Sequence, residues 1–158
     1  MRIPVLALTV GAALLLSCGS GPAPPPTVPA KAAASPAPPD ESRYLPAANR
    51  IDTTTAAGHL LDQPFMPGGT TGRYRKGKTE YIMFIAKLPT PQDAAFLLPE
   101  WRKALAGAKL VPSFGGYFGI EGERPVFVFA KGAWIAGVAG LAEKDADAAA
   151  RGLAARLD

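Results

Sequence analysis

The residues that could carry acid–base or nucleophilic chemistry are few and scattered. The chain has one histidine, His59, which stands beside the apolar pair Leu60-Leu61. A histidine base needs a nucleophile within hydrogen-bonding reach, yet Ser113 is the only serine after Tyr44. One histidine among scattered acids also makes a poor metal site. The sequence therefore predicts a protein that is not an enzyme and that uses no metal or cofactor.

The densest group of charges is basic and falls where a hairpin tip is expected. Glu80 is the only acid close to it in the sequence, and the group comprises Arg73, Arg75, Lys76 and Lys78. Such a tip could contact anionic lipid headgroups or an acidic envelope polymer. A solvated sheet edge that discourages aggregation explains the same residues. Both interpretations stay open at this point.

A second candidate is the aromatic and glycine-rich stretch Phe114–Gly119. It lacks the Lys-Ser/Thr pair that ends a phosphate-binding loop. One interpretation is an aromatic shelf for a ligand, formed by Tyr117, Phe118 and Trp134. The other interpretation is ordinary core packing, in which the glycines let a second backbone approach closely.

The only cysteine, Cys18, ends a short apolar run that begins at Val5 and closes with Leu15-Leu16-Ser17. The run is too short to remain as a transmembrane helix. This pattern resembles the lipobox of bacterial lipoproteins. The resemblance implies a diacylglycerol on the Cys18 thiol, cleavage just before it, and, because Gly19 follows rather than aspartate, an outer-membrane destination. An ordinary secretory peptide with an incidental cysteine is the alternative.

Composition divides the chain into three parts. Residues 1–17 are expected to be a lipoprotein signal peptide, and residues 18–43 the acylated cysteine with a disordered tether rich in proline and alanine. The tether has almost nothing to bury, and its prolines favour a semi-rigid spacer. A ligand for a domain that recognises PxxP motifs is the alternative. From Tyr44 the composition is globular, so residues 44–158 are expected to form one domain.

The first half of this domain predicts a lead-in followed by a hairpin and a helix. Residues 49–72 are ambiguous, with a helical turn expected around Ala56–Leu61. Residues 73–87 form the hairpin, and its second strand is apolar on both faces. Thr90 can cap a helix that starts at Pro91. The apolar stripe of this helix continues past Pro99, so we expect a kinked helix that buries Trp101.

The second half repeats this order. An edge strand interrupted by Pro112 precedes a hairpin at residues 125–139, and a helix follows at about Asp145–Leu157. Aligning Lys76-Gly77 with Lys131-Gly132 superposes the two hairpins, through either duplication or chance. The expected fold is α+β: a mainly antiparallel sheet with two helices packed on one face.

These observations favour a membrane-tethered lipoprotein of the bacterial envelope that acts as a non-enzymatic binding or accessory module. A small envelope hydrolase or transferase with an unrecognised site is the alternative. The expected partners are the membrane, through the lipid on Cys18, and an anionic lipid or envelope polymer or another protein. Nucleic acid is not expected, because an exported protein rarely meets it. The expected location is the outer membrane, facing the periplasm or the cell surface.

Overall fold

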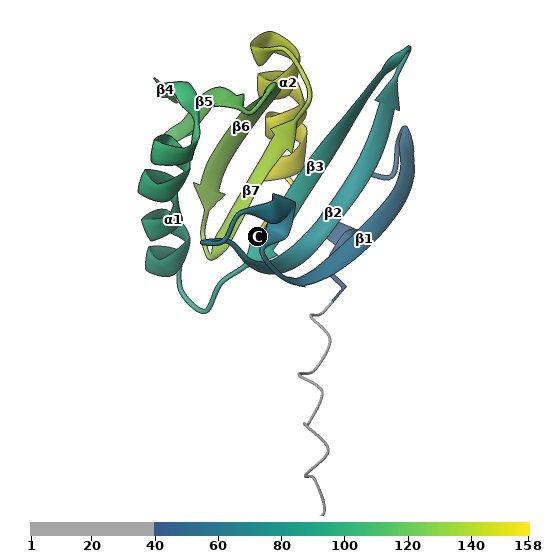
Figure 1. Cartoon of the computed structure of the whole chain (residues 1–158). Coiled ribbons are helices and arrows are strands. Elements are labelled where there is room, and N and C mark those ends of the chain that lie inside the picture. Colours follow the sequence, from purple (N-terminus) through teal and green to yellow (C-terminus); the bar gives the residue numbers. More distant parts are fainter. Residues whose placement is uncertain (1–39) are drawn as a thin grey trace, which may run out of the picture. The chain divides into compact units, whose positions relative to one another are not determined.

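The computed structural model describes residues 40–158 (Figure 1). Within them the chain forms strands, two α-helices and two short 3-10 helices. In chain order these elements are η1 (Ser42–Tyr44), β1 (Arg50–Gly58), η2 (Leu60–Asp62), β2 (Pro67–Lys76), β3 (Thr79–Lys87), α1 (Pro91–Ala104), β4 (Ala106–Val111), β5 (Gly116–Glu121), β6 (Arg124–Lys131), β7 (Trp134–Ala139) and α2 (Glu143–Ala154).

The strands of the described part form one seven-stranded antiparallel sheet in the order β1-β2-β3-β7-β6-β5-β4. Every connection but one joins two strands that are neighbours in the sheet. Because β3 and β4 run in the same direction, the chain between them must cross the sheet, and α1 makes this crossover. The expected α+β class and antiparallel sheet are confirmed.

Both faces of the central strands are apolar, and both are buried. Along β3, Met83 and Ile85 point to one face while Phe84 and Ala86 point to the other. This alternation follows from the two-residue period of a strand. A sheet that is apolar on two sides needs cover on two sides, which one pair of helices on a single face cannot provide.

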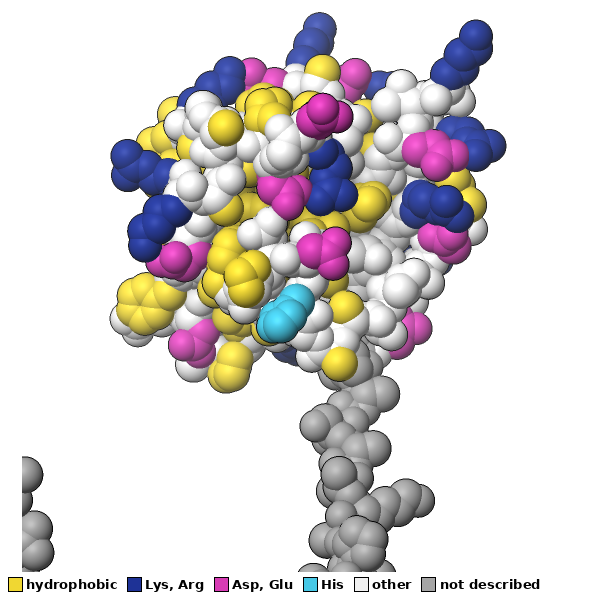
Figure 2. All heavy atoms as spheres, viewed as in Figure 1, with side chains coloured by type: hydrophobic (Ala, Val, Ile, Leu, Met, Phe, Trp, Pro, Cys, Tyr) yellow, Lys and Arg dark blue, Asp and Glu magenta, His cyan; other side chains and the backbone are white. Residues whose placement is uncertain are grey.

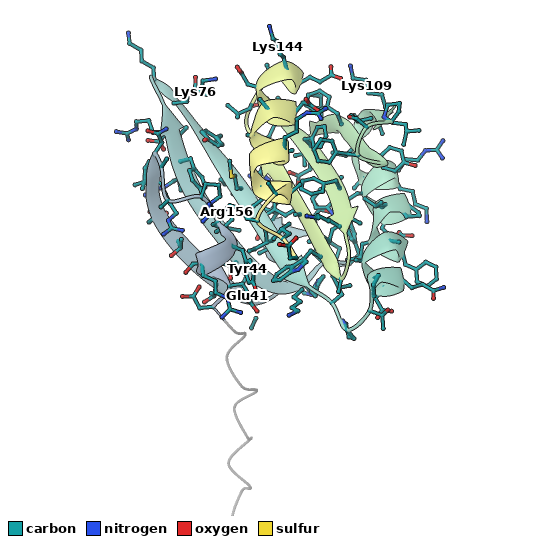
Figure 3. The ribbon with its side chains drawn as sticks, turned by 180° about the vertical axis from the view of Figure 1, so that it is seen from behind. Glu41, Tyr44, Lys76, Lys109, Lys144 and Arg156 are labelled. Atoms are coloured by element: carbon teal, nitrogen blue, oxygen red, sulfur yellow. The ribbon has the colours of Figure 1, made fainter. Side chains whose placement is uncertain are left out.

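The two helices accordingly lie on opposite faces, and the prediction that both pack on one face is wrong. Helix α1 packs Trp101 against the face that carries Phe84. Helix α2 packs Ala146 and Leu153 against the face that carries Ile85. Figure 1 shows α1 in front of the sheet, and Figure 3, the view from behind, shows α2 in front of the strands.

Helix α1 begins and continues as its sequence predicts. The Asp93 N–H donates to Thr90 Oγ1 at 3.1 Å, and the Thr90 N–H donates to Asp93 Oδ2 at 3.2 Å, which makes a reciprocal capping box. Pro99 lies within the helix without ending it. Trp101 is fully buried, and its Nε1 donates to Met66 Sδ at 3.2 Å.

The ambiguous stretch before the hairpin is largely extended, which corrects the expected loose lead-in. The run Thr53–Thr55 lies in β1, as suits β-branched residues. Strand β2 begins at Pro67, six residues before the expected hairpin start at Arg73, and it includes Gly69. A Cβ at Gly69 would lie 2.4 Å from the Ile85 carbonyl oxygen, so only glycine lets β2 approach β3 here.

The strand register bears on the suspected repeat. At the centre of the sheet Met83 pairs with Val138, which follows it by 55 positions, the spacing that separates Lys76-Gly77 from Lys131-Gly132. A two-fold axis perpendicular to the sheet through this pair would exchange the two hairpins and keep each face on its own side. Duplicated helices would then share a face. Because α1 and α2 do not, any repeat is confined to the hairpins.

Candidate functional site

The basic hairpin, meaning Arg73, Arg75, Lys76 and Lys78, lies at the end of β2 and its turn into β3. Arg73 Nε donates to Asp52 Oδ2 of the neighbouring strand β1 at 3.2 Å. Arg75 Nε donates to Glu80 Oε1 at 3.1 Å across the hairpin. The hydrogen bond from Arg75 lowers the pKa of the Glu80 carboxyl, and the bond to Asp52 raises the pKa of Arg73. Both arginines are therefore already paired.

The third cation of the basic hairpin is paired as well. Lys76 Nζ lies 3.0 Å from Asp145 Oδ1, in the first turn of α2. Glu80 is the only acid close to the basic hairpin in the sequence, but in space Asp52 and Asp145 also lie beside it, because the sheet order brings β1 and α2 next to the hairpin. Among residues 40–158, Lys78 has no ion-pair partner. Basic and acidic side chains alternate over this part of the surface in Figure 2.

A pocket of about 170 Å³ opens beside the hairpin. Its lining comes from β2, β3, β6, β7 and the residue that follows β7, and comprises Arg73, Glu80, Tyr81, Ile82, Arg124, Ala139 and Gly140. Arg124 is held by Glu121 at 2.6 Å, and Glu121 also accepts from Gln63 at 2.6 Å. The pocket is smaller than most small-molecule sites, and its walls carry both signs of charge. This geometry selects no ligand class.

The three rings of the expected aromatic shelf do not meet. Tyr117 and Phe118 are consecutive on β5, so they point to opposite faces and join different apolar clusters. Trp134 is 2% exposed at the start of β7, where its ring lies 4.8 Å from that of Tyr44. Because one ring faces α1 and the other two face α2, no single ligand surface contains them. They pack within the fold.

The residues with nucleophile or base character lie apart. His59 is exposed, as the one cyan side chain of Figure 2 shows, and its backbone N–H donates to the Met66 carbonyl oxygen at 3.0 Å. Ser113 Oγ accepts a hydrogen bond from Arg151 at 3.2 Å. Over residues 40–158 no three His, Cys, Asp or Glu side chains are grouped to hold a metal.

The signal peptide expected at residues 1–17 lies wholly outside the described residues, and the acylated cysteine with its tether, expected at residues 18–43, lies mostly outside them. Cys18 and the apolar run before it belong to residues 1–39, about which the structure says nothing. Within the described range, none of the helices has the length and apolar character required to cross a membrane.

Sequence reasoning missed a contact surface at the start of the folded chain. The N-terminal strap, residues 40–46, crosses β2 on the face that α2 covers. The Glu41 N–H donates to Thr70 Oγ1 at 3.1 Å, so the packed chain begins at least three residues before Tyr44. Arg50 donates to the Ser42 carbonyl oxygen at 2.9 Å. The start of the domain is therefore bound to β1 and β2.

The strap also contacts the other end of the chain. Arg156 Nε donates to the Tyr44 carbonyl oxygen at 3.1 Å, and the two residues lie together in Figure 3. Leu45 is 1% exposed within the core cluster that contains Leu153. The signal that could have revealed this was the pair Tyr44-Leu45, two large apolar residues shortly after the proline-rich segment, which ends at Pro39.

No family model matches this chain, and no curated protein and no solved structure matches it either.

Proposed function

We propose that the chain is a membrane-tethered lipoprotein of the bacterial envelope whose domain is a non-enzymatic binding or accessory module. The observation that carries this proposal is the apolar run Val5–Leu16 followed by Ser17 and the only cysteine, Cys18. A lipid on that thiol would attach the chain to a membrane. Gly19 after the cysteine favours the outer membrane as the destination.

The position of the first packed residues supports the division into tether and domain. Among the described residues, the first to bond to the sheet is Glu41, 23 residues after Cys18 in the sequence, and the intervening segment is rich in proline. A proline-rich chain extends by about 3 Å per residue. The tether would thus hold the domain several nanometres from the membrane, far enough for a partner to reach its surface.

The contacts of the chemistry-bearing side chains support a binding role rather than catalysis. Asp52, Glu80 and Asp145 each accept from a cation of the basic hairpin. Ser113 accepts from Arg151, and His59 lies exposed and away from it. A catalytic group needs a partner that it activates, whereas the three acids and Ser113 have partners that neutralise or occupy them.

The same ion pairs favour a protein partner of the domain over an anionic lipid or polymer. Three cations of the basic hairpin face three acids, so the cluster carries little excess charge for an anionic lipid or an acidic polymer. A protein partner that recognises the shape of the domain and its backbone hydrogen-bonding groups is favoured instead. The membrane itself would be contacted through the lipid on Cys18.

Mass spectrometry of the protein from its native host tests the tether. We expect the mature chain to begin at Cys18 and to carry a diacylglycerol on the thiol. A Cys18→Ser variant should lose the lipid, and its domain should be either released or stalled in the envelope as an unlipidated precursor, while Ser20→Ala, two residues away, should behave as the native chain. An uncleaved chain, or a mature chain whose Cys18 is unmodified, would show that the protein is not a lipoprotein.

A further inference from the structure

The two edges of the sheet differ in how they are protected. The β4 edge is short, and its register with β5 shifts between Ala106 and Lys109 around Gly107, which has a φ of +62°. Pro112 follows the strand directly. Lys109 lies on this edge and pairs with Glu143. A bulge, a lysine and a proline are the devices by which natural sheets block pairing with another strand.

The β1 edge has almost none of these devices. It is nine residues long, it is exposed on both faces over most of its length, and it lies outermost in the sheet (Figure 1). From Asp52 to Ala56 its register with β2 is unbroken, and the only irregularity lies at Ile51. The stretch contains no lysine and no proline. Alternate backbone N–H and carbonyl groups of such an edge point outward, and none of the strands within residues 40–158 pairs with them.

We propose that β1 pairs with β1 of a second copy of this chain, antiparallel and about a two-fold axis at Thr54. The two sheets would then continue into one another across an isologous interface. This proposal concerns the partner of the domain and does not depend on the lipid on Cys18.

The sequence of β1 is complementary to itself in this arrangement. Thr54 lies opposite Thr54 of the second copy, and Thr53 lies opposite Thr55. Threonine pairs across antiparallel strands are favourable, and like charges directly opposite one another are not. Asp52 would face Ala56, so the only carboxylate of the strand does not meet its own copy. Overlap of the regular stretch Asp52–Ala56 therefore places no repulsive pair at the interface.

The other candidate occupants fit less well. The segment of this chain that precedes the strap is interrupted repeatedly by proline, which cannot donate to a strand ladder. An extended segment of another protein could use the same edge, but it would gain nothing from the symmetry of Thr53–Thr55. The second copy is the occupant that accounts for that symmetry.

Charge exchange at the two-fold axis tests the proposal. Residues 19–158, which retain every residue that the structure describes, are studied by analytical ultracentrifugation from micromolar to millimolar protein. One strand from each copy makes an interface below the roughly 1,200 Å² of standard interfaces, so we expect a weak dimer. Thr54→Lys and Thr54→Asp, each alone, should raise its dissociation constant by about tenfold or more, because each new charge meets itself. A mixture of the two variants should restore the dimer.

The matched control is Leu110→Lys on the β4 edge, where Leu110 is 56% exposed. It should leave the dimer unchanged. A second readout uses Thr54→Cys, which would be the only cysteine of residues 19–158. Directly opposed strand residues lie within the Cα separation of a disulfide, so mild oxidation should link two copies at this position but not through Leu110→Cys. A monomer at millimolar concentration, or a dimer that the Thr54 variants leave intact, would overturn the proposal.

Discussion

The phenol of Tyr74 donates a hydrogen bond of 2.8 Å to the carbonyl oxygen of Pro46, and so joins β2 to the last residue of the N-terminal strap. The Tyr74 ring is fully buried and stacks on that of Tyr81 at 5.3 Å. Burial raises the pKa of Tyr74 to about 12, although the positive charge of Arg50 opposes the shift. The hydrogen bond of this one buried hydroxyl therefore depends on the strap being packed in place.

This shift makes the stability of the domain depend on alkaline pH. A tyrosine in an unfolded chain titrates near pH 10, so above that pH the unfolded state loses its proton first. The contribution of Tyr74 is complete below about pH 10 and is lost as the pH rises toward 12. Urea unfolding should show a steeper loss of stability over this range for the native chain than for Tyr74→Phe. Parallel curves for the two proteins would contradict the assignment.

Removing the strap should destabilise the domain although it removes no strand. A chain that starts at Ala47 loses the buried Leu45, uncovers Tyr74 and leaves Arg50 without its acceptors. Loss of one buried leucine side chain alone typically costs about 2–5 kcal/mol. We expect a clearly lower melting temperature than for a chain that starts at Asp40, measured by circular dichroism. Equal melting temperatures would mean that the strap contributes nothing to the stability of the domain.

Two aromatic residues of α1 offer a matched pair for the core. Trp101 is fully buried between the helix and the sheet, whereas Phe96 on the same helix is 63% exposed. Trp101→Ala should cost roughly 3–5 kcal/mol of unfolding free energy, because it empties a packed site and unpairs Met66. Phe96→Ala should cost well under about 1 kcal/mol. Chemical denaturation of both variants gives the comparison directly.

The basic hairpin should bind anionic vesicles weakly, because its charge is largely compensated. Replacing Asp52 and Glu80 by Asn and Gln frees Arg73 and Arg75, so this double variant should bind such vesicles more tightly and with a stronger dependence on salt. Vesicle co-sedimentation measures both. Strong, salt-sensitive binding by the native domain would restore the anionic surface as its main partner.

The parts of this fold that follow from the sequence are those with strong local patterns. The capping residues at Thr90 and Asp93 and the apolar stripe through Trp101 identified α1. The strand Thr79–Lys87 was evident as apolar on both faces. The same pattern bears on where the helices pack, since two apolar faces require cover on both sides, whereas the predicted fold put both helices on one face.

The parts that the sequence did not yield depend on contacts between distant residues. Strand β1 has a polar, β-branched run, Thr53–Thr55, without the alternation that marks a half-buried strand, because an edge strand exposed on both faces has no apolar face. The pairing of Lys76 with Asp145 joins residues that only the sheet order brings together. The hydrogen bond from Tyr74 to Pro46 is of the same kind.

The strap has a mechanical consequence. Any pull that reaches the domain through Asp40 acts first on hydrogen bonds to Thr70, Arg50 and Arg156, which belong to β2, β1 and the segment after α2. The load is thus shared between the first strands and the last residues of the chain, and these bonds must break before the pull acts on the pairing of β1 with β2. A domain suspended from a surface would resist tension as one unit.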